Sequence, residues 1–143
     1  MHMKRILLLL SFLFVALCAV LLCRWRGYVY LTQPPEVREV FLCEALDENS
    51  NPVNAGDQFR WGTRSVCLLF SYRSFQPKTA VDIKWLYEGR ILAEERVELL
   101  DEKNSCAFYL MKEDGAPLPI GNYAVVIESV GKVLSKKFFV VTR

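Results

Sequence analysis

Few side chains in this chain of 143 residues have the type and spacing that catalysis requires. The one histidine is His2, so the chain beyond it offers no Ser/His/Asp or Cys/His arrangement and no histidine-containing zinc site. No Gly-rich phosphate loop is present, and Glu94 and Glu95 are most simply explained as an exposed strand face. The sequence therefore predicts a protein that is not an enzyme and uses no cofactor; catalysis by carboxylates alone is the alternative.

The segment DENSN resembles the start of a calcium-binding loop, because Asp47, Asn49 and Asn51 stand at alternate positions. The pattern fails further along, where Pro52 takes the place of the required Gly and Gln58 the place of the bidentate Glu. We predict a solvated turn and no metal site.

Five cysteines are the remaining reactive groups. Cys18 and Cys23 lie in an apolar run, where they are either ordinary small residues or acylation sites. Cys43, Cys67 and Cys106 fall on three predicted strands, and an odd number of thiols cannot all pair within the chain. Two interpretations stay open: buried free thiols that act as small hydrophobic residues, or a Cys67–Cys106 disulfide.

The stretch FRWGTR is the first candidate binding surface, with Arg60, Trp61 and Arg64 as possible contacts to a partner. Trp and Arg are enriched at the hot spots of protein interfaces. The alternative is structural: Phe59 belongs to the core, Trp61 covers an edge of the fold, and the cations are merely solvated.

The stretch SYRSFQPK is the second candidate, as a possible contact to the membrane. Its contact residues would be Tyr72, Arg73, Phe75 and Lys78. A Phe beside two cations suits the headgroup layer of an anionic membrane. The alternative is that Phe75 folds back over the end of the domain.

The apolar run from Ile6 to Cys23 contains a single polar residue, Ser11. As a helix the run would cover about 27 Å, close to the roughly 30 Å hydrocarbon core of a bilayer. Its best signal-peptidase site, ALC at residues 16–18, has Cys where Ala is preferred and lies inside the run. We expect a retained transmembrane helix over residues 6–23; a cleaved signal or a lipoprotein signal is the alternative.

The flanks of this run predict the orientation of the chain. A basic tail, residues 1–5, precedes the run, and a juxtamembrane segment with a Pro linker, residues 24–36, follows it. Lys4, Arg5 and the terminal amine oppose Arg24 and Arg26, a margin of one charge under the positive-inside rule. We expect a single-pass protein of the cell membrane whose C-terminal domain, residues 37–143, is extracytoplasmic.

The charge balance says little about partners except to disfavour nucleic acid. The chain has 18 Lys and Arg against 16 Asp and Glu; because Lys4 and Arg5 precede the apolar run, the remainder is formally neutral. A nucleic-acid binder would show a basic stripe and a high isoelectric point in its soluble part.

Residues 37–143 are divided into short strands by turn signals. In VDIKWLY, for example, apolar and polar residues alternate, which places Trp85 on an inner face. The predicted strands are VREVFLCEAL, SVCLLFSY, VDIKWLY, ILAEERVELL, SCAFYLM, NYAVVIES and KVLSKKFFVV. Their even spacing predicts an all-β domain, a single seven-stranded antiparallel sandwich.

The segment PLPIGNYAVVI, in which Tyr123 enters the predicted sixth strand, resembles the same region of immunoglobulin-like and fibronectin-III-like domains. In those domains a Tyr at this corner bonds to nearby backbone, and a Trp on the third strand is buried. The resemblance implies an Ig-like β-sandwich with Trp85 and Tyr123 as structural core residues. It departs from antibody domains because Cys67 has no cysteine on the sixth strand to pair with, which favours a fibronectin-like or bacterial variant.

These observations predict a membrane-anchored extracytoplasmic binding or interaction module. Membrane lipid would be contacted through residues 6–23, and the domain would bind a protein partner. The alternative is an accessory structural subunit of a larger membrane complex, in which the helix itself is the interface.

Overall fold

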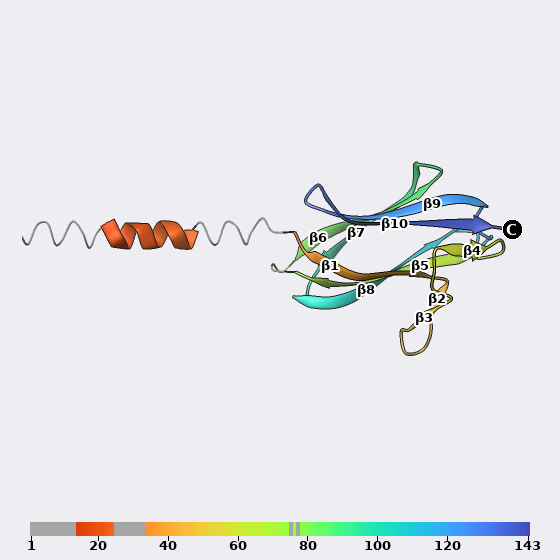
Figure 1. Cartoon of the computed structure of the whole chain (residues 1–143), viewed down its shortest axis with the longest axis horizontal. Helices are drawn as coiled ribbons and strands as arrows, with labels where there is room; N and C mark the ends of the chain where they lie inside the picture. The colour runs from red at the N-terminus through yellow and green to blue at the C-terminus, as the bar shows by residue number, and fades with distance from the viewer. Residues whose placement is uncertain (1–13, 25–33, 75, 77) are drawn as a thin grey trace, which may run out of the picture. The chain divides into compact units, whose positions relative to one another are not determined.

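The computed structural model describes residues 14–24, 34–74, 76 and 78–143. The chain divides into two compact units, Met1–Gln33 and Pro34–Arg143. In the first unit, residues 14–24 are helical (Figure 1). No helix within the described ranges is long and apolar enough to cross a membrane. The predicted transmembrane segment, residues 6–23, lies partly outside these ranges. The basic tail, residues 1–5, and residues 25–33 lie wholly outside them.

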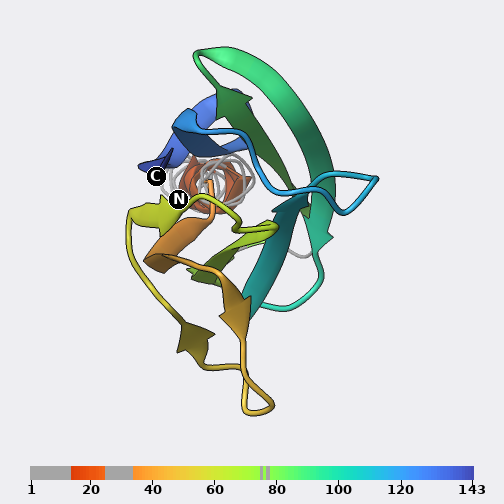
Figure 2. The same ribbon diagram turned by 90° about the vertical axis from the view of Figure 1, so that its right-hand side faces the viewer.

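The second unit consists of β-strands in two facing layers (Figures 1 and 2). The strands are β1 Glu36–Cys43, β2 Ala45–Leu46, β3 Pro52–Val53, β4 Gln58–Arg60, β5 Ser65–Arg73, β6 Thr79–Tyr87, β7 Arg90–Leu99, β8 Lys103–Met111, β9 Gly121–Ser129 and β10 Lys132–Thr142. One layer has the order β1-β5-β8 and the other β4-β10-β9-β6-β7, while β2 and β3 form a separate hairpin.

The seven predicted strands are present as β1, β5, β6, β7, β8, β9 and β10, and the described chain is mostly β. The prediction of seven strands in a purely antiparallel sandwich is wrong in detail. The structure has ten strands in three sheets, and β4 pairs with β10 in parallel. The first predicted strand, VREVFLCEAL, covers both β1 and β2, which the structure separates at Glu44. The two missed strands, β3 and β4, have two and three residues, too few to show an alternating pattern.

The topology fits an immunoglobulin-like fold with one distinguishing feature. The fourth long strand, β7, pairs with β6 and so joins the layer of the third, sixth and seventh long strands. In a constant-type immunoglobulin domain the fourth strand lies in the opposite layer.

The core lies between the two layers, where Trp85 is fully buried. The ring of Trp85 meets Phe139 edge-on, with 6.3 Å between ring centroids. Tyr123 stacks on the same phenylalanine at 4.8 Å, and its hydroxyl donates a 2.7 Å hydrogen bond to the Pro119 carbonyl. This bond closes the corner before β9, and burial raises the pKa of Tyr123 to about 12.

The cysteines are free thiols in the structure. The alternative of a Cys67–Cys106 disulfide is wrong, because Cys106 pairs with Phe70 on β5, three residues beyond Cys67. Phe70 belongs to the core, and Cys106 packs against that core. Since successive residues of a strand face opposite sides, the side chain of Cys67 lies on the outer face of the same sheet.

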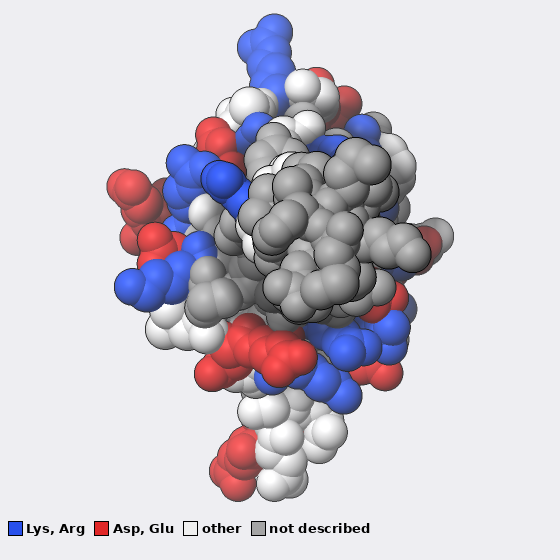
Figure 3. All heavy atoms as spheres, turned by 90° about the vertical axis from the view of Figure 1, so that its left-hand side faces the viewer, with Lys and Arg blue, Asp and Glu red and all other residues white. Residues whose placement is uncertain are grey.

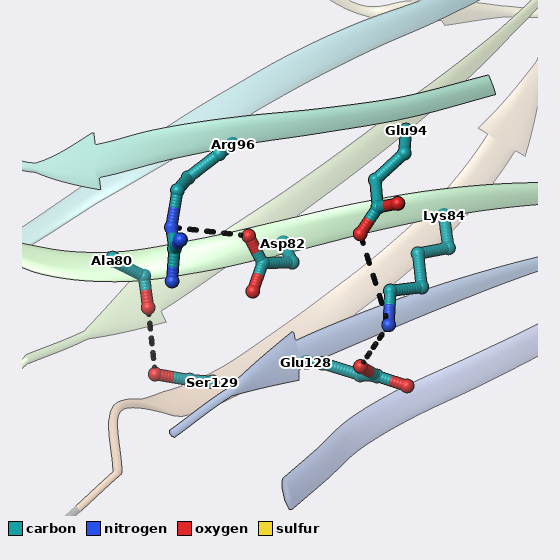
Figure 4. A network of polar contacts seen from close by, with 7 residues as sticks. All are labelled: Ala80, Asp82, Lys84, Glu94, Arg96, Glu128 and Ser129. Atoms are coloured by element: carbon teal, nitrogen blue, oxygen red, sulfur yellow. Dashed lines mark hydrogen bonds and ion pairs between the residues drawn. The ribbon is translucent and has the colours of Figure 1, made fainter. Parts of the chain in front are cut away.

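The outer face of the five-stranded layer carries a network of ion pairs (Figure 4). Lys84 Nζ lies 2.6 Å from Glu128 Oε2 and 3.8 Å from Glu94 Oε1. A second pair joins Arg96 and Asp82 at 3.3 Å. The hydrogen bond that Lys84 donates to the Glu128 carboxylate is the main reason that the pKa of Lys84 is raised. Glu94 therefore belongs to a partly exposed charged face.

Candidate binding surface

The end of the second unit opposite Glu36 gathers segments that are far apart in the sequence (Figure 1). We call it the distal end. It holds the chain between β1 and β5, the turn between β6 and β7, the segment before β9 and the end of β10; Figure 2 looks onto it. The predicted partner contacts Arg60 and Trp61 lie here.

Trp61 is held at the surface by the parallel pairing of β4 with β10. Phe59 pairs with Val141 and is buried in the core. Immediately beyond, the Trp61 amide donates a 2.6 Å hydrogen bond to the Thr142 carbonyl. The chain then turns at Gly62, whose φ of 104° suits only glycine. The backbone of Trp61 is thus fixed, while 65% of the residue stays exposed.

A hollow of about 560 Å³ opens beside this tryptophan, lined by Arg60, Trp61, Ile120 and Arg143. Ile120 is 41% exposed, and its carbonyl accepts a 3.0 Å hydrogen bond from the Tyr87 hydroxyl. The hollow therefore combines two apolar side chains and two guanidinium groups, brought together from three separate segments. We call these four lining residues the distal patch.

The third predicted contact, Arg64, does not line the hollow. Its guanidinium donates a 3.2 Å hydrogen bond to the Gly115 carbonyl. A second bond, from the Leu118 amide to the Thr63 carbonyl at 2.8 Å, joins the same two segments. Arg64 therefore connects the segment beside Trp61 to the segment before β9.

A second groove, of about 510 Å³, lies between the edge strands β7 and β8 and the segment before β9. Its apolar lining includes Leu92, Ala93, Leu110, Met111, Leu118 and Pro119. Sequence reasoning missed this groove, because its walls come from three segments whose meeting depends on the sheet order.

The four residues predicted to contact the membrane do not share one environment. Tyr72 is 4% exposed and belongs to the core, so it cannot contact a membrane; as part of β5 it faces inward like Phe70. Arg73 and Lys78 are exposed, while Phe75 lies outside the described residues. Figure 3 looks at the molecule from the left-hand side of Figure 1, and on the part that its grey atoms leave visible, basic and acidic side chains are intermixed.

The DENSN segment is a turn closed by its own side chain. Asp47 Oδ1 accepts hydrogen bonds from the amides of Asn49 and Asn51, at 2.9 and 2.8 Å. The bond from the Asn51 amide is the largest cause of the lowered pKa of Asp47. Nowhere in the described part of the chain do three His, Cys, Asp or Glu side chains meet in a group that could hold a metal.

No family model and no curated protein sequence matches the chain. Among solved structures, it is similar to the alkylpurine DNA glycosylase AlkC of Pseudomonas fluorescens, with 14% identity and a TM-score of 0.50 over 76% of this chain and 30% of that one. An immunoglobulin-like protein of Pseudomonas aeruginosa matches with 14% identity and a TM-score of 0.47, over 76% and 92%.

A β-glucosidase of Listeria innocua matches with 11% identity and a TM-score of 0.45, over 77% of this chain. The chain spans less than a third of the glycosylase and 16% of the glucosidase. At these identities the likeness to the glycosylase concerns the fold alone.

Proposed function

We propose that the chain is a non-catalytic, membrane-anchored extracytoplasmic binding module whose distal patch meets a protein partner. The observation that carries this proposal is Trp61, a large apolar residue that is 65% exposed on a fixed backbone. Trp and Arg are enriched among the few residues that carry most of the binding energy at protein interfaces. A side chain whose backbone is already ordered loses less entropy on binding, which favours affinity.

The chemistry of the distal patch indicates which kind of partner surface would be complementary to it. The indole of Trp61 and the side chain of Ile120 offer an apolar floor, and the guanidinium groups of Arg60 and Arg143 stand beside them. Arg binds carboxylates through paired hydrogen bonds. The fitting partner surface is therefore an apolar side chain flanked by Asp or Glu.

A crosslinking experiment tests this surface in the full-length protein in its own membranes. A photoreactive amino acid at position 61 should capture one partner, and the same group at position 138 should not. Phe138 is the matched control because it is also an aromatic residue 65% exposed, on β10. When Arg60→Glu is added to the protein with the photoreactive group at position 61, the yield of the crosslink should fall roughly tenfold or more, because the substitution reverses a charge that faces the partner's carboxylates.

Co-purification, read together with the crosslinking result, separates the proposal from the alternative of an accessory membrane subunit. If the distal patch binds the partner, Trp61→Ala should abolish co-purification in mild detergent. A stoichiometric membrane partner that remains bound to this variant, with no product from position 61, would contradict the proposal and favour an interface on the N-terminal helix.

The membrane part of the proposal rests on the composition of residues 6–23. Full-length protein should stay in the membrane pellet after a carbonate wash, with a mature N-terminus ahead of Ile6. As a control, Phe14→Arg places a charge near the middle of the run, at a cost of about 2.5–3.5 kcal/mol for insertion, and should lower the share of protein in the pellet. A mature chain that starts after Cys18 or Cys23 would contradict a retained anchor.

A further inference from the structure

Cys43 and Cys67 stand directly opposite each other in the antiparallel ladder of β1 and β5. Paired residues in such a ladder have Cα atoms about 4.5–5.5 Å apart, inside the range of about 4.4–6.8 Å that a disulfide spans. Leu42 and Leu68, the next pair in the ladder, belong to the core, so the two cysteines share the outer face. Cys43 Sγ lies 3.9 Å from the Cys67 carbonyl oxygen.

Both cysteines are fully buried although they lie on an outer face. The base of the β2–β3 hairpin closes over Cys43, since the backbone of Ala45 and Val53 approaches its thiol and the Glu44 amide bonds to the Val53 carbonyl at 3.0 Å. On the other side Tyr109, the β8 neighbour of Cys67, contacts that thiol. The two sulfur atoms are thus enclosed together, apart from the main core.

Each thiol also loses reactivity by this enclosure. Burial raises the pKa of the Cys43 thiol. Burial is also the largest cause of the raised pKa of Cys67, about 11, and the nearby Cys43 is the second. Because the thiolate is the form that attacks a disulfide, exchange is slow once the hairpin has closed. Cys106, the other cysteine of this unit, faces the core from the opposite side of the sheet and cannot compete for either partner.

We propose that Cys43 and Cys67 are a disulfide pair, which forms while the domain folds in an oxidising compartment. The oxidant is a disulfide, RSSR, of a thiol–disulfide oxidoreductase or a small thiol. One S–S bond and two S–H bonds break, one S–S bond forms between Cys43 and Cys67, and RSSR leaves as two RSH. The two electrons lost by the cysteines are those gained by RSSR, and both protons end on the released thiols.

The bond would attach the first strand of the domain to its neighbour across a sequence separation of 24 residues. Closing such a loop restricts the unfolded chain and so favours the folded state. The pairing follows from the ladder alone, whereas its formation in the cell also rests on the proposed extracytoplasmic location, since disulfides persist in oxidising compartments.

The test uses purified full-length protein in detergent, unfolded and then refolded with oxidised and reduced glutathione. Peptide mapping should find a link between Cys43 and Cys67, in the wild type and equally in the control Cys106→Ser. The linked protein should melt on the order of 10 °C above the same protein refolded with a reducing agent. Cys43→Ser should melt at one temperature under both conditions.

Three results would overturn the pairing, and none depends on a variant that folds. They are alkylation of both Cys43 and Cys67 after oxidative refolding, a link that involves Cys106 instead, and a linked wild type that melts below the reduced one. Thiol trapping in intact cells addresses location separately. A link that forms in vitro but is absent in the cell would leave the pair standing and count against the extracytoplasmic location.

Discussion

Trp85→Ala is expected to lower the free energy of unfolding by about 3–5 kcal/mol, a large part of the stability of a small domain. Trp85 is fully buried, and it fills the space beside Phe139 between the two layers. Removing the indole leaves a cavity that strands paired on both sides of β6 cannot close. The measurement is urea unfolding of the full-length protein in detergent, followed by far-UV circular dichroism.

Two further variants separate packing from the loss of any tryptophan. Trp61→Ala removes an indole that is largely exposed and should cost less than about 1 kcal/mol. Trp85→Phe should cost less than Trp85→Ala, because it keeps an aromatic ring and removes an Nε1–H that has no acceptor among the described residues. If Trp85→Ala unfolds at the same urea concentration as Trp61→Ala, the packing described for the core is incorrect.

Gly121→Ala is expected to destabilise the domain by about 2–4 kcal/mol, through backbone strain and overpacking together. Gly121 has a φ of 153°, and an added Cβ would lie 2.7 Å from Tyr87 Cε2 and from Glu88 Oε1. Neither neighbour can withdraw freely. The Tyr87 hydroxyl bonds to Ile120, and Glu88 Oε1 accepts a 2.7 Å bond from the Asn122 amide.

Gly56→Ala is the matched control, because an added Cβ there meets nothing within 4 Å. Both variants should be compared by thermal unfolding. We expect Gly56→Ala to stay close to the wild type. Gly121→Ala should also weaken capture at position 61, since Ile120 of the distal patch is its direct neighbour. Equal melting of the two variants would show that the corner before β9 accepts a side chain.

The sequence was informative wherever a strand is long enough to alternate. VDIKWLY places Trp85 inward by its own pattern, and the Tyr123 corner is contained within a few consecutive residues. The same rule, applied to SVCLLFSY, would have placed Tyr72 on the inner face with Leu68 and Phe70. The choice of Tyr72 as a membrane contact, although it ends the predicted strand SVCLLFSY, therefore conflicts with the strand's own pattern.

Features that depend on long-range pairing could not be predicted in this way. The hollow beside Trp61 exists because β4 pairs with β10, which brings together segments about eighty residues apart in the chain. Likewise, Cys43 meets Cys67 through the register of β1 and β5, and the long irregular connection between these strands does not fix that register. Local periodicity identifies the face of a strand but not its partner.

The bulge in β1 has a mechanical consequence. β1 is an edge strand and follows Pro35 directly, so any tension carried by the preceding chain acts on it first. Its ladder with β5 is interrupted between Arg38 and Phe41, where Glu39 has a φ of 48°. The pairs from Glu36 to Arg38 can therefore peel away under load while those from Phe41 onward hold, because Leu42 is buried in the core. A pull on the domain would be absorbed by a short extension at its edge before the sandwich itself begins to open.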